Sequence, residues 1–118
     1  MKKRVVVTGL GAISPIGNSV EEFEAAIKAG KSGVGPITGF DTTGFEVTIA
    51  AEVKDFESAN WMDKKDARKM ARFTQFAVAG AAQALTQAGL LETAPNGEGR
   101  RITGRPERTG VVLGNGIG

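Results

Sequence analysis

The chain has 118 residues, of which 41% are hydrophobic, and its 15 basic and 13 acidic side chains give a formal net charge of +2. This size suits one modest folded domain or part of one, and the near-balanced charge gives no bulk reason to expect nucleic acid or an anionic membrane as a partner. Because the sequence contains no cysteine and no histidine, it excludes disulfides, thiolate metal sites, a nucleophilic thiol and a histidine base. We therefore expect neither a metal site nor a catalytic triad in these residues.

The basic start of the chain, followed by apolar residues, resembles the beginning of a signal peptide. Gly9, Gly11 and Pro15 interrupt the apolar run before it reaches the usual length of such a segment. Nothing in the sequence approaches the roughly 20 continuous apolar residues that span a bilayer. We therefore expect a cytoplasmic protein without a membrane partner.

The first predicted element is a buried strand over residues 4–7, followed by a glycine-rich bend. Residues 5–7 are three consecutive valines, and an uninterrupted β-branched run is typical of a strand covered on both faces. Gly9 and Gly11 allow a positive φ or a close approach to another segment, and Pro15 disfavours a helix at the residue before it. This pattern indicates an α/β domain, in which the bend either binds a phosphate or only turns the chain.

The spacing of the glycines disfavours the phosphate-binding interpretation. Short-chain dehydrogenases carry a loop that resembles TGxxxGxG, whereas here Gly9 is followed by Gly11 and Gly17 with Pro15 between them. The sequence also lacks a clean second strand that ends in an acidic residue about 20 positions on, which would contact a ribose. Nucleotide binding is therefore the weaker alternative.

A capping box predicts a helix that starts after Ser19. The Ser19 hydroxyl can accept a hydrogen bond from the amide of Glu22, while the Glu22 carboxylate can reach back to the amide of Ser19. Apolar residues follow at helical spacing, and Gly30 supplies the C-terminal stop. The polar face of this helix carries no convergent chemistry, so we expect the helix to cover the sheet.

The middle of the chain combines an irregular segment with a second helical region. Residues 31–56 are punctuated by glycine and proline, with a short half-exposed strand predicted over residues 47–53. Asp63 is a candidate N-cap, and a long helix is predicted over residues 72–88, ended by Gly89. The predicted apolar stripe of this helix consists of Met70, Phe73, Ala77, Ala81, Leu85 and Ala88. Its many small residues would allow another helix or the sheet to approach closely, and its lack of charge predicts burial on most sides.

The last part of the chain is predicted to be a loop followed by a strand. Residues 91–108 are rich in glycine, proline and charge, with a turn at 95–97, and they read as an exposed loop with solvated arginines. Residues 109–113 resume the pattern of a buried strand, and they enter a second glycine-rich bend with the sequence GNGIG. A strand that enters such a bend is normally followed by a further element.

Several motifs, in the same order and at compatible spacing, resemble the N-terminal part of the β-ketoacyl-acyl-carrier-protein synthases, most closely the synthase II group. These motifs are RVVVTGLGAISPIGN, FDTTGFEVTIAAEVKDF, KKDARKMARFTQFAVAGAAQAL and GVVLGNGIG. The resemblance covers nearly the whole chain. The departure is residues 91–108, which look longer and richer in arginine than the usual connection of the family.

The resemblance implies a thiolase-like fold with layered α/β/α/β/α architecture, usually as a homodimer, of which residues 1–118 form the first part of the N-terminal half. The family elongates fatty-acyl chains by moving an acyl group from the phosphopantetheine of acyl carrier protein to a cysteine. It then condenses that group with malonyl-carrier protein after decarboxylation. The cysteine, two histidines and a lysine of the family lie downstream, so the resemblance implies no catalytic residue here and no condensing activity for these residues alone. No cofactor of the chain's own is expected, because phosphopantetheine arrives on the carrier protein.

Two groups of site residues follow from the resemblance. Lys65, Arg68 and Lys69, with Lys64 as an auxiliary, match positions where synthase II docks the acidic helix of acyl carrier protein. Basic residues three and four apart on a helix present together to an acidic partner, although the alternative is an ordinary solvated face. Ile117 matches a position that lines the acyl-chain pocket near the dimer interface, and its alternative is ordinary core packing.

Three other interpretations remain open at this point. A non-catalytic partner of a ketosynthase, similar to a chain-length factor, would share this region but lack the cysteine. A nucleotide-binding α/β domain is disfavoured by the glycine spacing. The residues could also form a fragment with structural meaning only.

Overall fold

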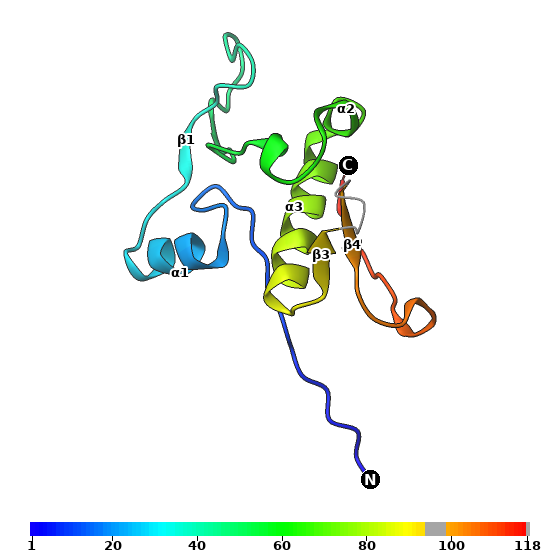
Figure 1. The fold of residues 1–118 in the computed structure, drawn as a ribbon. Helices are drawn as coiled ribbons and strands as arrows, with labels where there is room; N and C mark the ends of the chain where they lie inside the picture. Colours follow the sequence, from blue (N-terminus) through cyan, green and yellow to red (C-terminus); the bar gives the residue numbers. More distant parts are fainter. Residues whose placement is uncertain (94–98, 118) are drawn as a thin grey trace.

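Figure 1 shows the fold in the computed structural model, which describes residues 1–93 and 99–117. The long helix α3 lies in the middle of the molecule, and the other elements are arranged around it. The elements in chain order are α1 (Val20–Lys28), β1 (Val34–Pro36), β2 (Ile49–Ala51), η1 (Ser58–Asn60), α2 (Lys64–Ala67), α3 (Arg72–Gln87), β3 (Leu91–Thr93), β4 (Arg100–Ile102) and η2 (Pro106–Arg108).

The strands form two separate antiparallel pairs. In the pair β1–β2, Val34 lies opposite Ala51 and Pro36 lies opposite Ile49. β2 lies inside the predicted strand at residues 47–53. In the pair β3–β4, Leu91 lies opposite Ile102. The structure is therefore mixed in helix and strand.

The ends of α1 follow from the local sequence, with one difference from the predicted capping box. The Ser19 hydroxyl accepts a hydrogen bond from the Glu22 amide at 3.2 Å, as predicted. The Glu22 carboxylate, however, accepts from the amide of Asn18 at 2.7 Å, one residue before the predicted donor. At the other end, Gly30 adopts a φ of 63°, and its amide donates to the carbonyl oxygen of Ile27. This left-handed glycine ends the helix, as predicted.

Helix α3 begins and ends within a residue of the predicted limits. Its last turn is closed by Gly89, with a φ of 70°, whose amide donates to Thr86 O at 3.0 Å, while the amide of Leu90 donates to Leu85 O at 2.8 Å. The two bonds satisfy carbonyl groups that would otherwise lack partners at the helix end.

The glycine-rich bend packs directly on the backbone of α3. A Cβ atom on Gly9 would overlap the carbonyl oxygen of Ala84, and a Cβ atom on Gly11 would overlap the carbonyl oxygen of Gly80. Two residues of extended chain rise about as far as four residues of helix, so the two glycines meet positions four apart on α3. The predicted close approach of the bend to another segment is therefore confirmed.

Two glutamines on α3 bind the backbone of the same bend. Gln87 Oε1 accepts from the amide of Leu10 at 2.7 Å, and Gln83 Oε1 accepts from the amide of Ala12 at 3.0 Å. Gln83 Nε2 also donates to the carbonyl oxygen of Asn18 at 2.7 Å. The bend is thus attached to α3 through both its glycines and its amides.

The predictions of buried strands at residues 4–7 and 109–113 are wrong in this structure. Neither segment forms a strand, and their side chains are exposed, with Val5 at 93% and Val112 at 98%. A buried strand needs ladder partners and covering layers. Among the described residues none supplies a ladder for either segment, so the β-branched pattern has nothing to pair with.

The predicted burial of α3 is also wrong in part. Its buried side chains are Ala79 and Ala82, whereas Phe73, from the predicted apolar stripe, is 50% exposed. Ala77 and Ala81, from the same predicted stripe, are exposed as well. Across the described residues, the buried hydrophobic side chains are all alanines: Ala26, Ala67, Ala79 and Ala82.

Residues 91–108 contain more regular structure than the predicted loop. They hold the hairpin strands β3 and β4 and the short helix η2, and all three residues of β4 are exposed. Glycine, proline and arginine obscured the strand pattern there, because each hairpin strand is only three residues long. The predicted turn at 95–97 lies outside the described residues.

Candidate functional site

The basic surface is formed by four side chains on and just after α2: Lys64, Lys65, Arg68 and Lys69. The carboxylate of Asp63 accepts from the amide of Lys65 at 2.7 Å, which caps the helix as predicted. The helical turn continues past α2, because the amide of Lys69 donates to Asp66 O at 3.0 Å. Ala67 is 8% exposed and anchors the turn. Local capping and one buried alanine therefore orient the four cations.

The side chains of the basic surface project into solvent. Lys64, Lys65, Arg68 and Lys69 are all exposed, and within residues 1–93 and 99–117 the structure forms no ion pair with any of them. Residues at i, i+3 and i+4 share one face of a helix, so Lys65 presents together with Arg68 and Lys69. This arrangement can attract an anionic surface and offers no acid–base or nucleophilic chemistry.

Arg72, the next basic residue along the chain after Lys69, has a different environment. Its guanidinium lies 5.0 Å from the ring centroid of Phe76 and 5.6 Å from that of Phe56. The two rings meet edge to face with centroids 4.9 Å apart. This cation–π cluster fastens the start of α3 to the segment before η1. Arg72 therefore helps to hold α3, which follows the basic surface, against the segment before η1.

Gln75 is a positioning residue that the sequence analysis missed. Its Nε2 donates to the carbonyl oxygen of Ala67 at 2.9 Å and to that of Met70 at 3.3 Å. The Ala67 carbonyl also accepts from the amide of Met70, so Gln75 adds a second donor there and links the first turn of α3 to the end of the basic turn. A lone glutamine in a helix carries no sequence signal for such a role, so only the structure identifies it.

Ile117 lies outside two cavities, one next to α1 and the other beside η2. Its side chain is 99% exposed. The structure therefore places Lys64, Lys65, Arg68 and Lys69 on one turn. Ile117 contacts none of these four side chains.

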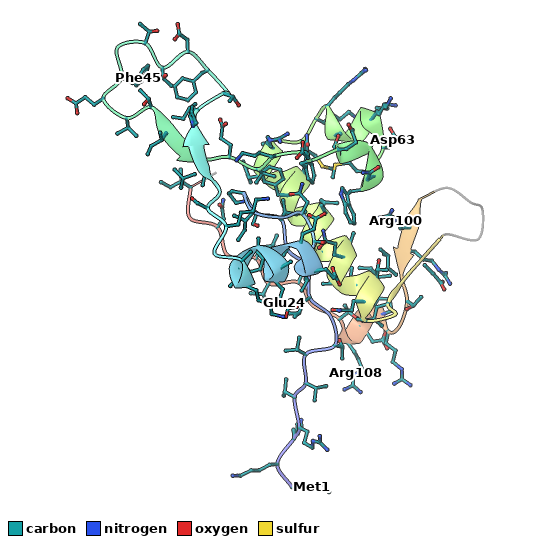
Figure 2. All side chains as sticks on the ribbon, turned by 90° about the vertical axis from the view of Figure 1, so that its left-hand side faces the viewer. Met1, Glu24, Phe45, Asp63, Arg100 and Arg108 are labelled. Atoms are coloured by element: carbon teal, nitrogen blue, oxygen red, sulfur yellow. The ribbon has the colours of Figure 1, made fainter. Side chains whose placement is uncertain are left out.

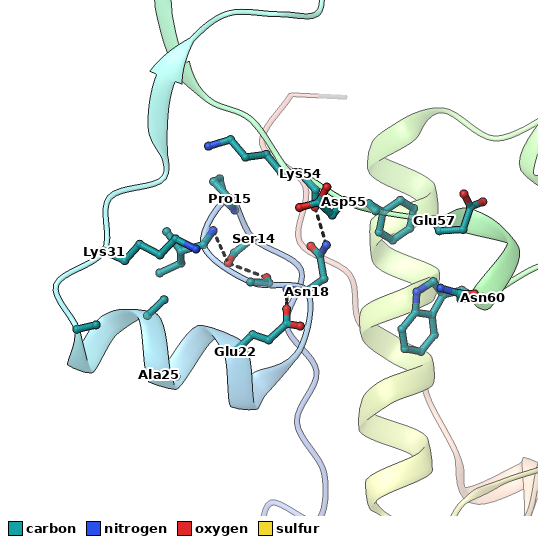
Figure 3. Close-up of a pocket in the computed structure, with 16 residues that line it drawn as sticks. Ser14, Pro15, Asn18, Glu22, Ala25, Lys31, Lys54, Asp55, Glu57 and Asn60 are labelled. Atoms are coloured by element: carbon teal, nitrogen blue, oxygen red, sulfur yellow. Dashed lines mark hydrogen bonds between the residues drawn. The ribbon is translucent and has the colours of Figure 1, made fainter.

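A cavity of about 710 Å³ lies between the bend at residues 14–18, α1 and the segment before η1 (Figure 3). Asn18 holds these parts together, because its Nδ2 donates to Lys54 O at 2.7 Å. The Oδ1 atom of Asn18 is buried and has no partner among the described atoms. Lys54 Nζ donates to Gly33 O at 3.4 Å. Within the described ranges no group of three or more acidic, histidine or cysteine side chains could hold a metal ion.

Two carboxylates with shifted titration lie outside the basic surface. Hydrogen bonds from the Thr38 hydroxyl, the Thr38 amide and the Gly39 amide hold the pKa of Glu52 below its ordinary value of 4.5. The amide and hydroxyl of Thr43 lower the pKa of Asp41 in the same way. Donors that bind a charged carboxylate favour its ionised form. Both groups fasten the loop that follows β1.

The glycine-rich bend is not arranged as a phosphate cradle. A phosphate would need free backbone amides at a helix start, but the amides of Leu10 and Ala12 already donate to glutamines of α3. This geometry agrees with the glycine spacing in disfavouring a nucleotide site. In the portion of the chain that the structure describes, no helix is long and apolar enough to cross a membrane.

The comparisons with known proteins agree on one family. Residues 2–118 match the family described as "Beta-ketoacyl synthase, N-terminal domain". The chain is 42% identical over 117 residues to the 3-oxoacyl-[acyl-carrier-protein] synthase 2 of Synechocystis sp. and 47% identical over 117 residues to that of Coxiella burnetii. Each alignment covers 99% of this chain and 26% of the relative, so the chain spans about a quarter of the length of these curated relatives.

A solved structure gives the same answer at the level of the fold. The structure of the ishigamide ketosynthase/chain length factor matches with a TM-score of 0.67 and 49% sequence identity, covering 72% of this chain and 21% of that one. At 49% identity, the two proteins are similar in sequence as well as in fold. The chain therefore belongs to the β-ketoacyl synthase family, whose N-terminal domain it matches along almost its whole length.

Proposed function

We propose that the intact protein is a condensing enzyme of fatty-acid elongation. It would join an acyl-enzyme thioester with malonyl-acyl carrier protein, release carbon dioxide and give 3-oxoacyl-acyl carrier protein. The observation that carries this proposal is the 42–47% identity of nearly the whole chain to proteins named 3-oxoacyl-[acyl-carrier-protein] synthase 2. The present residues contain no cysteine and no histidine, so the catalytic groups would come from the remainder of the protein.

In this proposal the present residues supply scaffold, carrier docking and part of the acyl pocket. They form the first part of the N-terminal half of a layered α/β/α/β/α fold, in a cytoplasmic homodimer. The exposed valines at residues 5–7 and 111–112 would find ladder partners and covering layers in that larger fold. No cofactor of the chain's own is needed, because phosphopantetheine arrives on the carrier protein.

The test of the enzymatic proposal is an assay of the intact protein with an acyl-carrier-protein thioester and malonyl-acyl carrier protein. We expect 3-oxoacyl-acyl carrier protein, measured by mass spectrometry, together with one carbon dioxide per condensation. The sequence of the remainder should contain a cysteine after a strand and two later histidines. A protein that lacks this cysteine and gives no product would contradict the proposal.

A second candidate is a non-catalytic partner of a ketosynthase, similar to a chain-length factor. It is favoured by the similarity to the solved ishigamide protein, whose name includes both a ketosynthase and a chain length factor. This candidate predicts condensation only after a separate ketosynthase is added. The same assay, with and without that ketosynthase, distinguishes the two functions.

The basic surface is proposed to dock the acidic helix of acyl carrier protein. Support comes from four exposed cations on one capped turn, a compact charge that steers an acidic partner. In the intact protein, Lys65→Glu and Arg68→Glu should each weaken carrier-protein binding, most strongly at low salt.

Lys28→Glu is the matched control for this experiment. Lys28 is exposed on α1 and paired with Glu24 at 2.6 Å, so its reversal changes the net charge as much as Lys65→Glu does but lies outside the basic surface. Equal affinities of all three variants and the wild type at low salt would remove the docking role.

A further inference from the structure

The hairpin strand β4 carries an arginine toward the basic surface. Arg100 Nη2 donates to the carbonyl oxygen of Asn60 at 3.2 Å, a contact between residues 40 positions apart. Asn60 ends η1, which packs against α2, and it precedes Lys64 by four positions in the sequence. Figure 2 shows Arg100 at the end of the hairpin nearer to Asp63, the N-cap of α2. The hairpin thus places a guanidinium beside the element that leads into the basic surface.

Two neighbouring arginines of this segment, Arg101 and Arg108, have other positions or partners. Arg101 Nη2 and Nε both bind Glu92 Oε1 at 2.6 Å, which neutralises its charge within the hairpin. Arg108 lies at the end of the hairpin farther from Asp63 (Figure 2). Arg100 is therefore the arginine of this hairpin that is positioned to act together with α2.

The contact of Arg100 with Asn60 orients its guanidinium and leaves its charge in place, because a carbonyl group is neutral. A guanidinium carries five N–H donors in a planar fork. The side chain belongs to an exposed residue, so the fork has room to bind a second group. Such a fork matches a carboxylate through two parallel hydrogen bonds, whereas lysine ammonium groups act as point charges.

We propose that Arg100 extends the basic surface and binds a carboxylate of the acidic carrier-protein helix that docks on Lys64, Lys65, Arg68 and Lys69. This inference rests on the proposed docking function of that surface. The lysines would supply long-range attraction, and the oriented fork of Arg100 would fix the register of the helix on the surface. The arginine-rich hairpin would then have a function beyond solvation.

The test uses the intact protein and measures the dissociation constant for holo acyl carrier protein between about 25 and 300 mM salt, where exposed charges become screened. Arg100→Ala should weaken binding about threefold to tenfold at low salt, as expected for a charge-assisted contact at a partly exposed site. The loss should shrink at high salt. Arg100→Lys should restore part of the affinity, since it keeps the charge and loses the fork. Arg101→Ala is the matched control and should bind as the wild type does.

Three results would overturn the role of Arg100. The first is unchanged affinity of Arg100→Ala at low salt while Lys65→Glu weakens binding, which would leave the docking function intact. The second is an equal loss in Arg101→Ala, which would indicate a nonspecific effect of hairpin charge. The third is a loss insensitive to salt and accompanied by a lower thermal midpoint, which would assign Arg100 a structural role through Asn60. If Lys65→Glu also binds normally, the proposed docking function fails as well.

Discussion

Gly11 lies against the main-chain carbonyl group of Gly80, so closely that a Cβ atom at position 11 would overlap the carbonyl oxygen. The neighbouring glycine, Gly9, meets Ala84 in the same way one helical turn along. Residues at both positions on α3 are small because the bend lies on the helix backbone itself. This contact acts together with the hydrogen bonds that Gln83 and Gln87 make to the bend.

Gly11→Ala is predicted to destabilise the intact protein by about 1–3 kcal/mol, the usual range for forcing an extra carbon into a packed contact. Backbone atoms of Gly80 cannot rotate away as a side chain could, so the bend must lift from α3. The measurement is the free energy of unfolding from urea titration, compared with that of the wild type.

Gly35→Ala is the control for this substitution. A Cβ atom on Gly35 would meet nothing within 4 Å, so its effect should stay within about 0.5 kcal/mol. Equal changes in the two variants would show that the contact of Gly11 with α3 is not the cause.

Gln83→Glu should cost more stability than Gln87→Glu. At both positions the new carboxylate can still accept from the bend, from Ala12 and Leu10 respectively. At position 83 it also loses the donor to Asn18 O and faces that carbonyl oxygen instead. We expect a loss of about 1–3 kcal/mol at position 83, the cost of an unsatisfied and partly buried acceptor.

The change at position 87 should stay within about 0.5 kcal/mol, because its single bond is retained. Unfolding midpoints of the two intact variants, measured at neutral pH in the same buffer, provide the comparison. If position 87 is at least as sensitive as position 83, then the bond to Asn18 O does not contribute.

The helices could be predicted from sequence because their signals are local. Ser19, Gly30 and Gly89 act within a few residues of the helix ends that they form, and the structure confirms all three. The close approach of Gly9 and Gly11 to another segment could also be predicted, because glycine has no Cβ atom, but the pattern did not identify α3 as that segment. The Glu22 carboxylate accepts from the amide of Asn18 instead of Ser19. This choice depends on side-chain geometry that the sequence pattern does not contain.

The predictions of buried strands were wrong for a different reason. A run of valines predicts a strand only where other strands complete its ladder, and residues 5–7 find none among the described residues. At the site, the cations of α2 could be predicted from spacing and resemblance. The hydrogen bonds of Gln75 and Arg100 could not, because each ends on a carbonyl group that folding brings near.

Glu52→Gln is predicted to change the pH dependence of stability. Hydrogen bonds from Thr38 and Gly39 lower the pKa of Glu52 in the folded protein below 4.5, so the unfolded state binds this proton more readily. The resulting stabilisation is therefore fully present above about pH 4.5 and is lost as the pH falls through the folded-state pKa. The amide of the variant does not titrate. The difference in unfolding free energy between the wild type and the variant should be largest near pH 7 and should decrease toward pH 3, and a difference independent of pH would contradict this account.

Ile117→Phe should shorten the longest acyl chain that the intact protein accepts, if Ile117 lines the acyl pocket as the family resemblance implies. A larger ring would fill space that the end of the alkyl chain needs, and one methylene in an apolar pocket changes selectivity by about 10–200-fold. In the present residues Ile117 is 99% exposed, so its surroundings in the intact protein would be supplied by other parts of the fold. Rates with acyl-carrier-protein substrates of increasing length provide the measurement, and Ile117→Val, which keeps the shape and adds no volume, is the control. A length profile that Ile117→Phe leaves unaltered, in a protein with normal thermal stability, would assign Ile117 to ordinary packing.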